Sequence, residues 1–215
     1  MPAAVSNILA VMALRLARAD PTPSPDALLW EQVCGGEDRA FRSVFDRHAP
    51  GVRRFLGDLL RDASLADEGT QETFVRAHAN RAGLKQREKL VPWLLGIARF
   101  VAIELRRAQR ASSTTSWEAL ESGERTGKAV PCPGPTPEHV LLGRETERLL
   151  RDGLATLPDH RRAVLLLRLD HGLPYEDIAQ AMGWSLGKVK TEIHRARQTL
   201  RAELGPHFTD TGDAP

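Results

Sequence analysis

Residues 174–200 read PYEDIAQAMGWSLGKVKTEIHRARQTL, and no other stretch of the chain indicates its architecture as strongly. Apolar residues recur at helical spacing on both sides of Gly183, which predicts two helices, 174–182 and 185–204, joined by a tight turn. The residues spaced to pack these helices together are Ile178, Met182, Val189 and Ile193. This spacing is typical of a helix-turn-helix, in which the second helix enters the major groove of DNA.

The second helix of this pair carries a concentrated positive charge. Between residues 186 and 201, five basic side chains stand against one acid, Glu192, whereas the whole chain has a net charge of only +2. Cationic side chains that contact phosphates release counterions from DNA. A basic run alone is usually a solvated helix face, but directly after this turn it favours DNA binding.

The rest of the chain also predicts helices. The 215 residues are 41% apolar and only 5% aromatic, and apolar residues keep helical spacing throughout. No segment alternates as a half-buried strand would. The remaining predicted helical segments cover 26–34, 37–60 with an interruption at Pro50-Gly51, 64–79, 92–110, 138–156 and 159–170. The predicted fold is all-α, with two small helical domains joined by a flexible linker and the helix-turn-helix in the C-terminal domain.

Composition sets the predicted domain boundaries. Residues 111–138 are rich in Ser, Thr, Gly and Pro, which favours a linker. A proline-rich break at residues 21–25 ends any helix before it. The prediction is therefore a flexible N-terminal extension over 1–25, a first domain over 26–110, the linker, a second domain over 139–205 and a tail over 206–215.

The first domain has one acidic and one basic segment. Residues 58–72 carry a local charge of −4, and the segment 99–110 carries +3. Oppositely charged faces on one small domain suggest two different partners. In the acidic segment, Ser64 is the expected helix cap, and Phe74 and Val75 are expected to be buried.

Several function classes lack support in the sequence. The two cysteines, Cys34 and Cys132, do not form a zinc or disulfide framework, and they fit a reducing cytoplasm. Metal-binding HExxH, phosphate-binding and nucleophile-elbow patterns are missing, so no catalytic residue, metal or cofactor is predicted. No apolar run of about 18 residues predicts a membrane span, and the expected location is cytoplasmic.

Four segments in order carry a resemblance to a known family. They are DEGTQETFV at 67–75, WLLGIARFVAIELRR at 93–107, LATLPDHRRAVLLLRLDHGLPYEDIAQAM at 154–182 and LGKVKTEIHRAR at 186–197. Together they resemble the extracytoplasmic-function (ECF) group of the sigma-70 family of bacterial RNA polymerase sigma factors. The chain departs from the family pattern with Phe100 in place of Asn, Glu104 in place of Asp, and Gly69 and Thr70 in place of apolar residues. Glu192 is a further departure, expected either to accept from a cytosine amino group or to repel phosphate.

The resemblance implies a sigma region 2-like first domain, a sigma region 4-like second domain and a role for each charged segment. The acidic helix would bind core RNA polymerase through Asp67, Glu68, Gln71 and Glu72. The minus-ten promoter element would be bound, with its bases unstacked, by Lys85, Arg87, Lys89, Arg99, Phe100, Arg106, Arg107 and Arg110. The minus-thirty-five element would be read by Lys188, Lys190, Thr191, His194, Arg195 and Arg197.

The implied function is initiation of transcription at a stress- or signal-responsive gene set, without enzymatic activity of the chain's own. The implied partners are core RNA polymerase, promoter DNA and an anti-sigma factor, with no direct insertion into a membrane. Two alternatives remain open from the residues. One is a dimeric helix-turn-helix regulator that works without sigma activity, and the other is a small helical enzyme with a basic substrate site.

Overall fold

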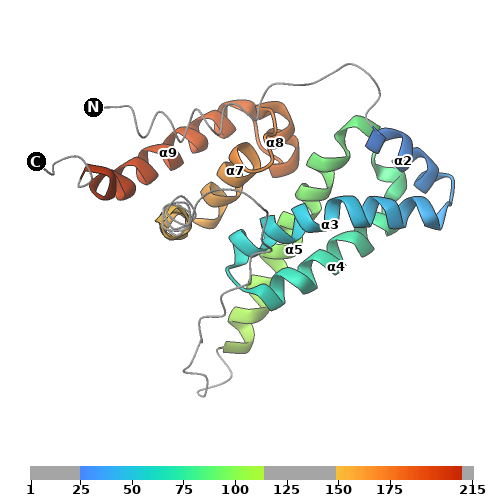
Figure 1. Cartoon of the computed structure of the whole chain (residues 1–215), viewed down its shortest axis with the longest axis horizontal. Helices are drawn as coiled ribbons and strands as arrows, with labels where there is room; N and C mark the ends of the chain where they lie inside the picture. Colours follow the sequence, from blue (N-terminus) through green and yellow to red (C-terminus); the bar gives the residue numbers. More distant parts are fainter. Residues whose placement is uncertain (1–24, 114–148, 210–215) are drawn as a thin grey trace, which may run out of the picture.

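The computed structural model describes residues 25–113 and 149–209, and within these ranges every regular element is helical (Figure 1). The first half contains α2 (Pro25–Cys34), α3 (Asp38–Leu60), α4 (Ala63–Ala79) and α5 (Leu90–Ser113). Two short 3-10 turns, η2 (Arg81–Gly83) and η3 (Arg87–Lys89), precede α5. The second half contains a helical segment at 149–156, then α7 (Asp159–Leu169), α8 (Tyr175–Met182) and α9 (Leu186–Thr209). The all-α prediction is confirmed.

The predicted helices are present, but several ends differ. Helix α3 continues through Pro50, although an interior proline costs roughly 3 kcal/mol in an isolated helix. Buried Val44 and Val52 lie on either side of it, so packing outweighs the local cost. Helix α5 begins at Leu90 and continues to Ser113, three residues into the segment predicted to be a linker, and α9 continues past residue 205. The remaining linker, the N-terminal extension up to residue 24 and the last six residues lie outside the described residues, as does the start of the helix expected at 138.

Two local predictions in α4 are wrong. Asp62, rather than Ser64, caps the helix, because its carboxylate accepts the backbone N–H of Leu65 at 2.9 Å. Phe74 is buried as predicted, whereas Val75 is 62% exposed. The buried face of α4 runs through Thr70, Thr73, Phe74 and Ala77, and Val75, about 100° further around the helix from Phe74, lies outside it.

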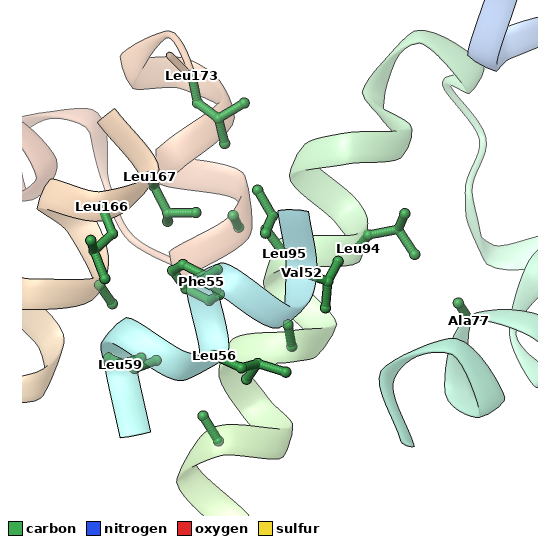
Figure 2. Close-up of a cluster of buried hydrophobic side chains, with 14 of the residues drawn as sticks. Val52, Phe55, Leu56, Leu59, Ala77, Leu94, Leu95, Leu166, Leu167 and Leu173 are labelled. Carbon is green, nitrogen blue, oxygen red and sulfur yellow. The ribbon is translucent and has the colours of Figure 1, made fainter. Parts of the chain in front are cut away.

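One apolar core runs through both halves of the molecule. Phe55 and Leu56 of α3 and Leu95 of α5 lie in the same buried cluster as Leu166 and Leu167 of α7 (Figure 2). Helices α5 and α8 approach closely, since a Cβ placed on Gly96 would lie 3.4 Å from the Cα of Ala181. The second half is therefore packed against the first.

Polar contacts reinforce the interface between the two halves, which we call the seam. The guanidinium of Arg162 is buried and donates to the carbonyls of Leu154, Ala155 and Leu157 within its own half, at 2.8 to 3.0 Å. It also donates to the carbonyl of Leu59 at the end of α3, at 3.1 Å. One arginine thus satisfies carbonyls from both halves, which a buried guanidinium needs in order to offset its lost hydration.

Candidate nucleic-acid interface

The turn between α8 and α9 has the geometry that the sequence predicted. Gly183 adopts a left-handed conformation, with φ of 65°. The N–H of Trp184 donates to the carbonyl of Ala179 at 2.9 Å, and that of Gly183 donates to Gln180 at 3.2 Å. This pair of bonds is a Schellman motif, which glycine at that position permits. Ser185 then caps α9 by accepting the N–H of Lys188 at 3.3 Å.

Helix α9 presents most of its predicted DNA-contacting residues to solvent. The exposed ones are Lys188, Lys190, Thr191, His194 and Arg195. Val189 and Ile193 lie on the opposite face and are buried against the rest of the protein. Arg197 differs from the others, because it is half-buried and its buried Nε has no hydrogen-bond acceptor within the described ranges.

Glu192 does not occupy the exposed face of α9. It is 8% exposed, and its Oε2 accepts from the Nε of Arg161 on α7 at 2.8 Å. Its Oε1 accepts from Arg195 at 3.3 Å. The hydrogen bond from Arg161 is the main reason that the pKa of Glu192 lies below its usual range. The expectation that Glu192 either accepts from a cytosine amino group or repels phosphate stays a prediction, and both of its oxygens are already engaged within the protein.

The residues predicted to contact the minus-ten element fall into two groups. Lys85, Phe100, Arg107 and Arg110 are exposed, and Phe100 is 55% exposed despite its apolar ring. The guanidinium of Arg99 lies 4.8 Å from the centre of that ring. Burial lowers the pKa of Arg99, and its Nη1 is a buried donor without an acceptor. The structure thus places an exposed aromatic face beside a cation, an arrangement on which an unstacked base can stack.

The second group is engaged within the protein. Arg87 donates to the carbonyl of Leu84. Lys89 pairs with Asp177 of α8 at 2.6 Å. Arg106 donates to the carbonyl of Leu59 and pairs with Asp159 of α7. Lys89 and Arg106 therefore lie on the seam between the halves, where carboxylates of the second half neutralise them.

The acidic helix α4 presents a mixed face. Glu68 and Gln71 are exposed, and Glu72 is partly so. Arg53 of α3 donates to both carboxylate oxygens of Asp67, and these hydrogen bonds lower the pKa of Asp67. Arg76 bridges Glu72 and Glu104 at 2.6 Å each. Because Asp67 pairs with Arg53 and Glu72 pairs with Arg76, the more available polar groups on this face are Glu68 and Gln71.

Sequence reasoning missed Val75 as a surface residue. Its exposed side chain lies one helical turn beyond Gln71 and Glu72, so it extends the polar face with an apolar contact. The available signal was the helical spacing of Ala66, Thr70, Thr73, Phe74 and Ala77, because the face through these residues leaves Val75 on the other side.

The described part of the chain offers neither a metal-binding cluster nor a membrane span. No group of three or more His, Cys, Asp or Glu side chains there could hold a metal ion. None of the helices in the same ranges is both long and apolar enough to cross a membrane.

The two halves of the chain match two different regions of one known protein family. Residues 44–112 match sigma-70 region 2, and residues 147–200 match sigma-70, region 4. The chain is 33% identical over 176 residues to the RNA polymerase sigma factor CarQ of Myxococcus xanthus, covering 81% of this chain and 95% of that protein. It is 27% identical over 175 residues to the ECF RNA polymerase sigma factor SigW of Bacillus subtilis, covering 81% and 94%.

Solved structures show the same fold at lower identity. The sigma factor RpoE of Bartonella quintana, solved with the anti-sigma factor NepR, matches with a TM-score of 0.62 at 22% identity, over 77% of this chain and 96% of that chain. CnrH, solved in complex with the cytosolic domain of CnrY, matches with a TM-score of 0.60 at 22% identity, over 84% and 97%. By its two matched regions, in this order, and by its identity to CarQ over nearly that protein's full length, the chain belongs to the ECF group of the sigma-70 family of RNA polymerase sigma factors.

Proposed function

We propose that this sigma factor binds core RNA polymerase through α4, captures the minus-ten element on α5 and reads the minus-thirty-five element with α9. The observation that carries the proposal is the separation of charge on one chain. Helix α4 exposes the acids Asp67 and Glu68, whereas the predicted reading face of α9 exposes Lys188, Lys190 and Arg195. An acidic face repels DNA, so the two faces suit a protein partner and a nucleic acid respectively.

The proposed polymerase contact rests on the exposed part of α4. Glu68, Gln71 and Val75 follow one another along one side of the helix. A face that combines a charge, an amide and an apolar side chain is suited to a basic protein surface with an apolar depression. Asp67 and Glu72 would contribute after partial release from Arg53 and Arg76, or as part of those ion pairs.

The proposed promoter contacts combine two kinds of recognition. Phe100 and Arg99 offer a stacking surface for an extruded base, with Arg107 and Arg110 near the strand's phosphates. Lys188, Lys190, Thr191, His194 and Arg195 offer cations and hydrogen-bonding groups to the major groove. Four further predicted contacts would reach DNA only after their present contacts within the protein change. They are Arg87, Lys89, Arg106 and Arg197.

The proposal extends to partners and location. The two structural neighbours described above were solved with proteins bound to them, one of which is named an anti-sigma factor. We propose an anti-sigma partner for this chain on that likeness. The chain itself would catalyse no reaction, and it would act in the cytoplasm, where core polymerase meets the chromosome.

Run-off transcription tests the proposal. Purified core polymerase and this chain are incubated with a DNA fragment from upstream of the chain's own gene. The expected result is a discrete transcript that requires both proteins. A complex with the polymerase but no transcript would contradict the choice of template, whereas no complex, together with dimeric DNA binding, would support the helix-turn-helix regulator instead.

A pair of matched variants tests the polymerase face. Glu68→Lys with Val75→Glu alters the exposed side of α4 and leaves the Arg53–Asp67 pair intact. We expect at least a tenfold weaker affinity for core polymerase, about 1.4 kcal/mol, which is an ordinary loss for altered interface residues. Glu31→Lys on α2 makes the same charge change as Glu68→Lys on another exposed surface and should keep full binding. Equal binding by both variants would remove α4 from the polymerase contact.

A further inference from the structure

Glu192 is the single acid within the basic segment of α9, and its position has a consequence for recognition. Its side chain is turned toward α7 and bridges two arginines. Oε2 accepts from the Nε of Arg161 at 2.8 Å, and Oε1 accepts from Arg195 at 3.3 Å. The Nε2 of His160 lies 3.6 Å from Oε2. Both carboxylate oxygens are therefore used inside the protein.

Arg195 is the partner that connects this cluster to DNA. Its side chain is 55% exposed, and it lies on the face of α9 that carries the other proposed contacts. A free arginine side chain samples many rotamers, and holding one of them on a base edge costs conformational entropy. A carboxylate that already holds the guanidinium removes part of that cost before DNA arrives.

The anchor for Glu192 lies outside the reading helix. Arg161 belongs to α7, and its side chain is 26% exposed. The ring of His160 contacts the ring of Trp184 with centres 6.1 Å apart, and the Nζ of Lys188 lies 4.2 Å from the Trp184 ring centre. The first turn of α7 thus supports Arg195 through Glu192, and it supports Lys188 through the ring of Trp184.

We propose that Glu192 is a positioning residue, which together with Arg161 holds the guanidinium of Arg195 in the orientation that contacts the minus-thirty-five element. Its contribution is to sequence discrimination, not to overall DNA affinity. The inference rests on the proposed role of α9 as the reading helix. It assigns to Glu192 and Arg161 a part in promoter choice, although neither touches a base.

The positioning role of Glu192 can be distinguished from a simpler role, in which its negative charge only repels DNA phosphates. A carboxylate that only repels phosphates would weaken binding to every DNA sequence equally. Its removal would then raise affinity for promoter and scrambled DNA by the same factor. Removal of a positioning residue instead lowers the affinity for the promoter relative to scrambled DNA, so the two roles predict different ratios.

The experiment compares two DNA duplexes bound by the full chain in complex with core polymerase. One carries the minus-thirty-five region of a promoter mapped by the run-off assay, and the other carries the same base pairs scrambled. For Glu192→Gln, we expect the ratio of the two affinities to fall about tenfold, the usual worth of one good side chain–base contact. Affinity for scrambled DNA should stay the same or rise. Glu203→Gln removes an exposed acid from the same helix and should leave the ratio unchanged.

Two further variants distinguish positioning from folding. Arg161→Glu combined with Glu192→Arg restores an ion pair between α7 and α9 but places a cation beside Arg195. We expect this swap to recover the midpoint of thermal unfolding without recovering the affinity ratio. Adding Glu192→Gln to Arg195→Ala should lower the ratio no further than Arg195→Ala alone, because the two residues act as one unit.

Three results would overturn the inference. The first is a wild-type ratio in Glu192→Gln. The second is full recovery of the ratio by the charge swap, which would make the pair purely structural. The third is a ratio of promoter affinity to scrambled-DNA affinity that equals one in the wild type as well as in every variant. The wild type alone would reveal this result, which would refute the role of α9 as the reading helix.

Discussion

His171 is a buried titratable residue at the seam between the halves, and its surroundings oppose a positive charge. Its side chain is 9% exposed, and its ring packs edge-on against Phe55 of α3 with centres 5.8 Å apart. Its Nε2 is buried and has no hydrogen-bond partner among the described residues, although Oδ2 of Asp170 lies 3.5 Å away. Burial lowers the pKa of His171, nearby Arg54 lowers it further, and Asp170 offsets part of the effect.

The lowered pKa predicts a loss of stability in acid. The unfolded state takes up a proton near the ordinary histidine pKa of about 6.5, while the folded state resists it, so the unfolded chain binds more protons below that pH. The free energy of unfolding should therefore decrease as the pH falls below about 6.5. His171→Gln should flatten this decrease in urea unfolding curves measured from pH 7 to pH 5. His194→Gln, which removes an exposed histidine, should keep the wild-type slope, and an unchanged slope in His171→Gln would contradict the assignment.

Helices α5 and α8 pack closely at Gly96. A Cβ at this position would lie 3.4 Å from both the Cα and the carbonyl oxygen of Ala181, which is ordinary van der Waals contact. Gly96→Ala should therefore fit, and the gain in helix propensity should keep the free energy of unfolding equal to the wild type or raise it by up to about 1 kcal/mol. Gly96→Leu should force α5 and α8 apart at a cost of roughly 1–3 kcal/mol.

The control for this pair is Gly187→Leu. Nothing lies within 4 Å of a Cβ placed on Gly187 in α9, so a large side chain there meets open space. Urea unfolding midpoints for the three variants test the difference. Equal midpoints for Gly96→Leu and Gly187→Leu would mean that α5 and α8 do not depend on their close approach.

The elements themselves were predictable, but their contacts were not. Apolar spacing placed the helices because it reflects which face of each one is buried, and Gly183 marked the turn because few other residues adopt its φ. The inward turn of Glu192 depends on Arg161, which lies 31 positions earlier on another helix. Lys89 and Arg106 likewise meet carboxylates on the second half. Periodicity within one helix contains no information about such distant partners.

The apolar core that the two halves share predicts that they unfold together. Phe55 is fully buried in the cluster that joins α3 and α5 to α7 (Figure 2), and its ring also contacts His171. Since apolar contacts at the seam couple the halves, calorimetry of the wild type should give one transition, with equal calorimetric and van't Hoff enthalpies.

Phe55→Ala tests that coupling, because it opens a cavity at the seam. The expected cost is about 3–5 kcal/mol, and the calorimetric transition should broaden or split in two as each half unfolds on its own. Phe74→Ala is the matched control, since Phe74 is equally apolar and buried but packs against Phe41 and Phe45 within the first half. It should lower the melting temperature and leave a single transition. If Phe55→Ala also retained one sharp transition, the coupling would reside in the other contacts that join the halves, which are the rest of the apolar cluster, the Gly96–Ala181 approach, the ion pairs and Arg162.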